Sequence, residues 1–323
     1  MARVEIAGVA SSLPAKVVTN FDLEALMETS DDWIRKRTGI AERRAVTTET
    51  TGSMAADAAR KALESAGIAK EDVGLIIACT ITGDDVTPSM ASGVQRALGI
   101  ASCAAMDVAA GCTGFVYALV SAASLMETLD VGAALVVASE SMTSLADWSD
   151  RTTCVLFGDG AGAVALKKSE AEHVGCAVLA GSPDDEDVLF VRGEARPTPF
   201  APTEKTGREY LHMKGREVFT YAVGALEDVL KRLLAKCGDK PFTKVIPHQA
   251  NAKIIDCVMR ALHWTPDQFF VNIDKYANTS SATIPIAMSD AVQQGWLRKG
   301  DRVALVGFGS GLTCGGVVID WTL

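Results

Sequence analysis

A short glycine motif occurs twice in the chain, and each copy leads into an apolar strand. One copy begins at Phe157 and the other at Phe308, and both have the pattern Phe-Gly-x-Gly. A helical pattern and then an apolar strand precede each copy. These segments are the helical patterns Met54–Ala66 and Phe219–Cys237 and the strands Val73–Cys79 and Val245–Pro247. The recurring order predicts two pseudo-repeated halves.

Continuously apolar strands indicate how the halves are layered. Leu75–Ala78 and Ala133–Ala138 contain no polar residue, as expected for strands that helices cover on both faces. We therefore predict a layered α/β fold with helices between and outside two mixed sheets, divided into residues 1–172 and 173–323. A polar stretch, Ser182 to Arg208, separates the halves. We expect a solvated excursion there, with a wall of a substrate mouth as the alternative.

Composition excludes several classes of function. The net charge of −9 argues against nucleic acid as a partner, because binding a phosphate backbone needs a basic surface. The eight cysteines include no Cys-x-x-Cys pair and indicate reduced thiols, and no cluster has the spacing of metal ligands. The uncharged segment 108–126 contains glycines and serines, so we interpret it as a core helix and not a membrane span. We expect a cytoplasmic protein that opens on a strand.

Cys112 is the most reactive candidate in the sequence. It lies among small residues, directly before an apolar helical pattern that runs from Phe115 to Met126. The N-terminus of a helix supplies partial positive charge and free N–H groups, which stabilise a thiolate. We therefore predict that Cys112 is a nucleophile and that its pKa is lowered.

Two further residues complete a candidate set. His248 lies in Pro-His-Gln-Ala-Asn and Asn278 in Asn-Thr-Ser-Ser, both in the second half. We expect them to meet Cys112 in a cleft between the halves. Cysteine proteases also combine Cys, His and Asn. An extended peptide would not easily reach a thiol in such an apolar segment, whereas a thin thioester arm would.

Five motifs follow one another in an order typical of one enzyme family. They are Ser30–Ile34 with Arg37–Ile40, Ala110–Phe115, Phe157–Gly162, Pro247–Asn251 and Asn278–Ala282. With them the chain resembles, over its whole length, the β-ketoacyl-acyl-carrier-protein synthase III group of thiolase-fold condensing enzymes. The resemblance implies a thiolase-like fold and an acyltransferase that needs no cofactor.

The resemblance also implies a reaction that initiates fatty acid synthesis. Cys112 takes the acyl group of an acyl-CoA, and malonyl-acyl carrier protein then loses CO₂ and attacks the acyl-enzyme. His248 and Asn278 would donate hydrogen bonds to the enolate oxygen, and a carboxylate in their place would repel the malonyl group. The backbone N–H groups of Cys112 and Ser310 would bind the second oxyanion. The family often has Gly at the position of Ser310, so only a main-chain role is carried over.

An acidic protein must meet the phosphates of CoA with local cationic and aromatic groups. By the resemblance, Trp33 stacks on the adenine and Arg151 covers its other face, while Arg37 and Thr29 contact the nucleotide. The residues that the resemblance assigns to the pantetheine and acyl tunnel are Gly215, Phe219 and Asn251.

The carrier protein is acidic and would dock on positive charge near the tunnel mouth. The candidate docking residues are Lys214, Arg216, Lys253 and Arg260. The resemblance also implies a homodimer, in which Thr87 reaches the partner's acyl pocket. We expect Thr87 to leave room for acyl chains longer than acetyl.

Three other functions fit parts of the pattern. A thiolase would need a second catalytic cysteine, for which Cys314 is the candidate. A related acyltransferase or condensing enzyme of secondary metabolism would keep the acyl-cysteine but make another product. A catalytically inactive dimer partner would usually lack the nucleophile, whereas this chain retains Cys112, His248 and Asn278.

Overall fold

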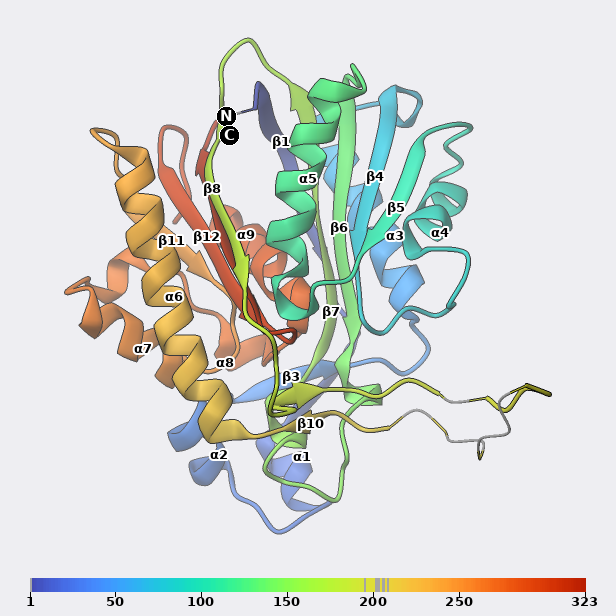
Figure 1. Cartoon of the computed structure of the whole chain (residues 1–323), viewed down its shortest axis with the longest axis vertical. Helices are drawn as coiled ribbons and strands as arrows, with labels where there is room; N and C mark the ends of the chain where they lie inside the picture. The colour runs from blue at the N-terminus through green and yellow to red at the C-terminus, as the bar shows by residue number, and fades with distance from the viewer. Residues whose placement is uncertain (1, 195, 201–203, 205–206, 208) are drawn as a thin grey trace.

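Two large sheets stand side by side in the computed structural model, which describes residues 2–194, 196–200, 204, 207 and 209–323 (Figure 1). The first sheet has the order β1-β7-β6-β4-β5 and the second the order β11-β12-β13-β8. Their strands are β1 (Val4–Ser12), β4 (Val73–Cys79), β5 (Ala104–Val108), β6 (Ala133–Ser141), β7 (Asp159–Lys168), β8 (Val174–Gly181), β11 (Lys244–Pro247), β12 (Arg302–Gly309) and β13 (Thr313–Asp320). Two small hairpins pair β2 (Lys16–Thr19) with β3 (Glu42–Ala45) and β9 (Leu189–Phe190) with β10 (His212–Met213).

The two large sheets repeat one arrangement of strands. In the first, β1 and β6 flank β7 antiparallel to it, and β4 runs parallel to β6. In the second, β8 and β12 flank β13 in the same way, and β11 runs parallel to β12. Each Phe-Gly-x-Gly copy lies where the chain enters the middle strand, β7 or β13. The predicted repeat is therefore confirmed, with β5 as an added edge strand.

Helices lie between the sheets and on their outer faces. The helices are α1 (Asn20–Glu24), α2 (Asp31–Thr38), α3 (Thr51–Ala66), α4 (Met90–Leu98), α5 (Gly114–Thr128), α6 (Gly215–Cys237), α7 (Ala252–Ala261), α8 (Ile273–Tyr276) and α9 (Thr283–Gln293). α5 and α9 pack between the two sheets, α3 and α4 cover the outside of the first, and α6 covers the outside of the second (Figure 1). The predicted layers are thus present.

Alternate residues of β4 show why the central strands carry no polar side chain. Leu75 and Ile77 pack in the core around α5 and α9. Ile76 and Ala78 point to the other face and pack beneath α3. Both faces are buried, so the two-residue alternation of a half-exposed strand is lost.

The apolar segment 108–126 does not form one helix. Val108 ends β5, a short 3₁₀ turn spans Gly111–Thr113, and α5 begins only at Gly114. Gly111 has a φ of +51°, a left-handed conformation that favours glycine. The predicted helix was therefore correct in its body and wrong at its start. No helix in the described part of the chain is both apolar and long enough to span a membrane.

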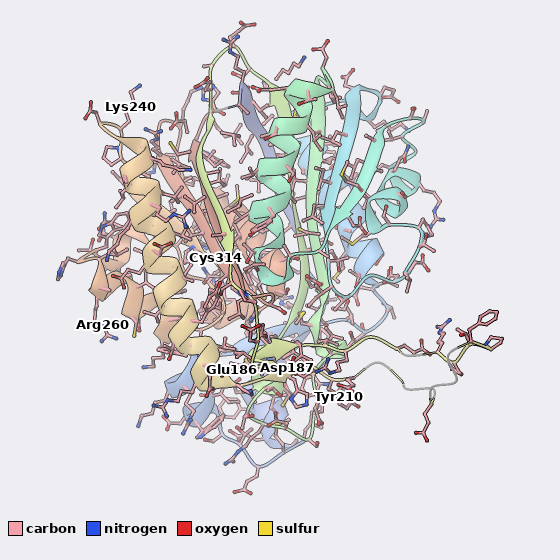
Figure 2. The ribbon with its side chains drawn as sticks, in the orientation of Figure 1. Glu186, Asp187, Tyr210, Lys240, Arg260 and Cys314 are labelled. Carbon is pink, nitrogen blue, oxygen red and sulfur yellow. The ribbon has the colours of Figure 1, made fainter. Side chains whose placement is uncertain are left out.

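The stretch between the halves is only partly described. Arg208, where the predicted excursion ends, and six other positions of the stretch lie outside the described residues. Beside the lower end of α6, Figure 2 shows Glu186 and Asp187, close to the β9–β10 hairpin. Asp184 accepts hydrogen bonds from the backbone N–H groups of Val188 and Leu189, which fixes the entry to β9.

Candidate active site

One pocket of about 430 Å³ receives residues from both halves of the chain. Cys112 lines it from the first half, and His248 and Asn278 line it from the second. The other predicted site residues that line it are Trp33, Arg37, Gly215, Arg216, Phe219, Asn251 and Ser310. The structure therefore brings Cys112, His248 and Asn278 together in one pocket, as the sequence predicted. The chemical roles of these residues stay predictions.

Two glycines bring the candidate oxyanion donors together. A Cβ atom on Gly309 would lie 2.7 Å from the backbone N of Cys112, and one on Gly111 would lie 3.1 Å from the backbone N of Ser310. A side chain at Gly309 would require the backbone to shift, since Cβ atoms do not approach other atoms so closely. Glycine thus lets the β12–β13 turn lie directly against the turn that carries Cys112.

Burial dominates the chemistry of the Cys112 thiol. Loss of hydration raises its pKa to about 11, the hydroxyl of Ser280 lowers it, and the charge of Glu140 raises it. The predicted lowering of this pKa is therefore wrong. α5 begins two residues after Cys112, and its first three residues, Gly114, Phe115 and Val116, are buried, so the cost of a buried thiolate exceeds the helix-terminus effect.

His248 is held rigidly and in its neutral form. Its backbone N–H donates to Val306 O at 2.8 Å, and the ring of Phe308 packs at 66° with centroids 5.3 Å apart. Burial lowers its pKa to about 3. Nδ1 lies 2.6 Å from Thr283 Oγ1, whereas Nε2 is buried and has no hydrogen-bond partner among the described residues. His248 lines the pocket, so Nε2 is the ring nitrogen left for a ligand there.

Asn278 is oriented by the backbone around it. Its Oδ1 accepts the backbone N–H of Ser280 at 2.8 Å, and its own N–H and C=O pair with Leu156 and Gly158. Because the carbonyl oxygen of the amide is occupied, the NH₂ group is the part available to a ligand in the pocket. This is the donor that an enolate oxygen requires.

Sequence reasoning missed a buried carboxyl group next to the site. Glu140, at the end of β6, is fully buried and accepts hydrogen bonds from Thr82 Oγ1 at 2.8 Å, Ser281 Oγ at 2.7 Å and the N–H of Ile81 at 3.0 Å. Burial raises its pKa. It joins the first half to the turn that follows Asn278. A charged residue at the end of an apolar strand was the available signal.

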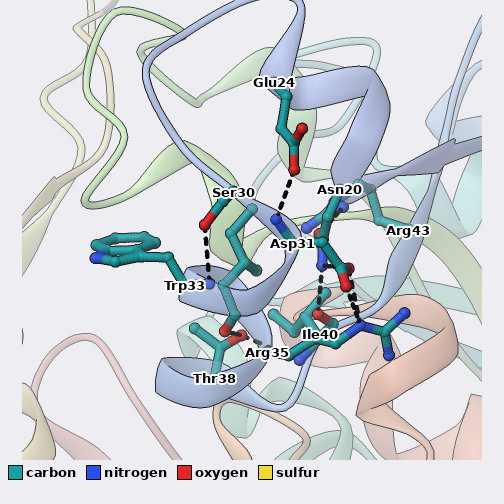
Figure 3. A network of polar contacts seen from close by, with 10 residues as sticks. Asn20, Glu24, Ser30, Asp31, Trp33, Arg35, Thr38, Ile40 and Arg43 are labelled. Atoms are coloured by element: carbon teal, nitrogen blue, oxygen red, sulfur yellow. Dashed lines mark hydrogen bonds and ion pairs between the residues drawn. The ribbon is translucent and has the colours of Figure 1, made fainter.

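Trp33 is presented to the pocket by a capped and braced helix. Ser30 Oγ accepts the N–H of Trp33 at 3.2 Å, and Asp31 accepts hydrogen bonds from Asn20 at 2.9 Å and from Arg35 at 2.8 Å. Asn20 in turn accepts from Arg43, which is fully buried. In Figure 3 the indole points away from this network. The network therefore fixes α2 and does not include the indole.

Two guanidinium groups already lie over this indole. The Cζ atoms of Arg37 and Arg151 are 4.7 Å and 5.3 Å from its ring centroid. Arg151 also donates to the carbonyl oxygen of Glu28. Neither Arg151 nor Thr29 lines the pocket itself. Thr29 Oγ1 is buried without a hydrogen-bond partner in the described chain.

The remaining predicted residues lie around the mouth or away from it. Lys214 precedes α6 and donates to the carbonyl oxygen of Glu186. Lys253 and Arg260 are both exposed on α7, and Arg260 lies at the outer edge of the molecule in Figure 2. Thr87 is exposed and does not line the pocket.

The stretch between the halves contributes to the pocket wall. Leu189, within the predicted excursion, lines the pocket, as do Leu211 and Met213 just beyond it. Ser310 Oγ donates to Leu189 O at 2.6 Å. Most described residues of the stretch are exposed, as expected for a solvated excursion, while Leu189 fits the alternative, a wall of the mouth.

The described residues contain no group of three or more His, Cys, Asp or Glu side chains arranged to hold a metal ion.

Cys314 lies on β13 (Figure 2), is 7% exposed and does not line the pocket. The thiol that this pocket offers a ligand is therefore Cys112.

Comparison with known proteins gives one consistent family. Residues 106–182 match the model of 3-oxoacyl-[acyl-carrier-protein (ACP)] synthase III, and residues 235–321 match that of its C-terminal part. The β-ketoacyl-[acyl-carrier-protein] synthase III of Clostridium acetobutylicum is 40% identical over 100% of both chains. That of Erythrobacter litoralis is 44% identical over 99% of this chain and 100% of its own.

A solved structure agrees with this assignment. The crystal structure of 3-oxoacyl-[acyl-carrier-protein] synthase III from Aquifex aeolicus superimposes with a TM-score of 0.90 at 40% identity, covering 98% of this chain and 100% of that one. The fold is therefore the thiolase-like fold of that enzyme. By sequence and by structure, this chain belongs to the β-ketoacyl-acyl-carrier-protein synthase III family.

Proposed function

We propose that this chain condenses an acyl-CoA primer with malonyl-acyl carrier protein, with loss of CO₂, and so initiates fatty acid synthesis through an acyl-Cys112 intermediate. The observation that carries the proposal is the pocket in which Cys112, His248 and Asn278 meet. The relatives in two bacterial species, which carry the synthase III name over their full length, support it.

The first half-reaction is a thioester exchange. Cys112 loses its proton to solvent, and the thiolate attacks the acyl-CoA carbonyl. The carbonyl oxygen then carries negative charge, which the backbone N–H groups of Cys112 and Ser310 stabilise. CoA leaves as a thiolate and takes a proton from water, while the acyl group stays on Sγ. The raised pKa of Cys112 keeps the resting thiol protonated.

The second half-reaction needs neutral hydrogen-bond donors. The bond between the malonyl carboxylate and Cα breaks, CO₂ leaves, and the electron pair becomes an enolate that His248 Nε2–H and Asn278 Nδ2–H stabilise. The enolate carbon attacks the acyl-enzyme, and Cys112 leaves as a thiolate that takes up a proton. Because burial lowers the pKa of His248 to about 3, the imidazole works as a neutral donor.

Two groups of residues would bind the two substrates, acyl-CoA and the carrier protein. Arg37 and Arg151 lie over the Trp33 indole, and this aromatic and cationic group suits the adenine and the phosphates of CoA. Lys253 and Arg260 on α7 offer positive charge to an acidic carrier protein.

A homodimer in the cytoplasm completes the proposal. β5 ends its sheet, and its residues are mostly exposed. A second copy could pair along this free edge, since an uncovered edge strand offers unpaired backbone groups. Thr87 would then reach the acyl pocket of the partner.

Two units, 1–172 and 173–323, are proposed as the repeated halves, with the boundary between β7 and β8.

A thiolase is the weaker alternative. Its second catalytic cysteine would have to be Cys314, which lies outside the pocket that contains Cys112. A condensing enzyme of secondary metabolism differs only in its primer and product, which the experiment below identifies.

Intact-mass spectrometry with a panel of acyl-CoAs tests the proposal. We expect the mass of one acyl group on the wild-type chain and none on Cys112→Ser, followed by a β-ketoacyl-carrier product when malonyl-acyl carrier protein is added. Loading of chains longer than acetyl would support the expectation for Thr87. Equal loading of Cys112→Ser would overturn the proposed nucleophile.

A further inference from the structure

We propose that Cys176 and Cys237 are a redox-sensitive pair that forms a reversible disulfide with oxidised glutathione, a small-molecule disulfide, as the oxidant. Both are free thiols in the structure, and both are partly buried. Cys176 lies on β8, and Cys237 is the last residue of α6. The proposed function uses neither residue, so this modification site is independent of it.

Two crossed contacts hold the segments of the two cysteines together. Cys176 Sγ donates to the carbonyl oxygen of Lys236 at 3.3 Å. The Lys236 ammonium donates to the carbonyl oxygen of Ala177 at 2.8 Å. Lys236 and Ala177 are the direct chain neighbours of Cys237 and Cys176. The end of α6 therefore lies on β8 at the positions of the two cysteines.

The two thiols also interact directly. The pKa of Cys237 is raised to about 11, mainly by burial and then by the charge and the hydrogen bond of the Cys176 thiol, while the Arg302 guanidinium lowers it. A hydrogen bond that raises the pKa of a thiol is one that its S–H donates. Cys237 thus donates to Cys176 Sγ, whose own proton is directed to Lys236 O. A disulfide needs two sulfur atoms that face each other on neighbouring backbones, and this pair provides them.

Cys176 is the thiol that a small oxidant reaches first. Together with Lys236 it lines a surface pocket of about 600 Å³ between α5 and β8, and Cys237 does not line this pocket. The raised pKa keeps Cys237 protonated, and a protonated thiol is a poor nucleophile. Cys176 is therefore the attacking thiol and Cys237 the resolving one.

The bridge forms by two thiol–disulfide exchanges. Cys176 loses its proton to solvent, and its thiolate attacks one sulfur of oxidised glutathione. The S–S bond of glutathione breaks, and one glutathione leaves as a thiolate that takes up a proton. Cys237 then loses its proton and attacks Cys176 Sγ, which releases the second glutathione. The two cysteines lose two electrons and the two glutathione sulfurs gain them, so excess reduced glutathione reverses the reaction.

This bridge would lie far from Cys112. α6 has 23 residues, which span about 35 Å, and its first residue, Gly215, lines the pocket that contains Cys112. In Figure 2, Lys240, just beyond Cys237, lies at the opposite end of the helix from Glu186. Oxidation should therefore leave the acyl loading of Cys112 in place.

The bridge should also stabilise the fold. It would enclose the whole stretch between the halves and almost all of α6 in one covalent loop. A disulfide that closes a long loop restricts the unfolded chain. The oxidised chain should therefore unfold at a temperature several degrees higher than the reduced chain.

Peptide mapping of the full chain after treatment with oxidised glutathione tests the proposal. The reduced chain has eight free thiols. The treated wild type should lose two alkylation sites and yield a non-reduced peptide pair that joins Cys176 to Cys237. Cys237→Ser should keep one glutathione on Cys176, because no resolving thiol remains, and Cys176→Ser should yield no linked pair. Cys257→Ser, which removes a partly buried thiol on α7, should still form the bridge.

Three results would overturn the proposal. The first is a wild-type chain that keeps all eight thiols in excess oxidised glutathione. The second is glutathione on Cys176 or Cys237 of the wild type without a linked pair. The third is an unfolding temperature that does not rise in the bridged chain, or that rises equally in treated Cys176→Ser. Reduced glutathione should restore all eight alkylation sites, and a bridge that resists it would contradict the proposed reversibility.

Discussion

The reactivity of Cys112 should rise steeply with pH and show no plateau near neutrality. Burial raises its pKa from 9.0 to about 11, and two pKa units correspond to about 2.7 kcal/mol against the thiolate. At pH 7 the thiolate fraction is then about 10⁻⁴, compared with about 10⁻² for a thiol of ordinary pKa. Alkylation by iodoacetamide should therefore rise about tenfold per pH unit between pH 7 and pH 10.

The measurement is the rate at which iodoacetamide modifies the peptide that contains Cys112, followed by mass spectrometry from pH 6.5 to pH 10. Cys112→Ser identifies the signal, and circular dichroism at each pH checks the fold. Ser280→Ala removes the hydroxyl that lowers this pKa. Alkylation of this variant at pH 8 should therefore be slower than that of the wild type. A plateau below pH 8.5 in the wild type would show that the helix terminus outweighs burial.

Four further predictions test other parts of the site. Asn278→Asp should still load acyl groups but lose about 100-fold in CO₂ release, because a carboxylate repels the malonyl group; comparable losses in both steps would contradict this. Trp33→Ala should raise the KM for acyl-CoA about tenfold, as expected for the loss of one stacked base, with the KM for the carrier as control. Charge reversal at Lys253 and Arg260 should raise the KM for the carrier at low salt, and no change would remove the docking proposal. Ser310→Ala keeps the backbone N–H but frees the β9 carbonyl, so it should relax acyl-length preference in a series of acyl-CoAs.

Sequence patterns predicted the buried elements best. The apolar positions of α7, Ala252–Ala261, follow the helical period, so the sequence itself indicates this helix. α6 begins at Gly215, four residues before the predicted start, since its first three residues, Gly215 to Glu217, are exposed and carry no apolar side chain. The start of α5 was missed because the small residues 109–113 suit a helix as well as the turn they form. The period of apolar residues indicates which face of a helix is buried. Where a helix begins or ends depends on contacts with other segments, which this period does not show.

The parts of the site that were missed act through positions that no motif reveals. Ser280 has a φ of +51°, uncommon for a residue with a side chain. Its hydroxyl lowers the pKa of Cys112 only because the opposite half places the thiol beside it. Thr283 and Glu140 likewise depend on contacts between segments far apart in sequence. The sequence identified the reacting groups, and the fold determines their protonation.

A single cause, burial, acts in opposite directions on the pKa values of two groups that line the pocket from the two halves. It raises the pKa of Cys112 to about 11 and lowers that of His248 to about 3, because both charged forms lose hydration. A thiolate–imidazolium pair is therefore strongly disfavoured in the resting site, whereas cysteine proteases depend on a thiolate paired with histidine. Malonyl decarboxylation needs no such pair, because its transition state places new charge on an oxygen that neutral donors can bind. The same burial that makes Cys112 slow to ionise thus keeps His248 neutral, and a neutral His248 is the form required beside a malonyl group.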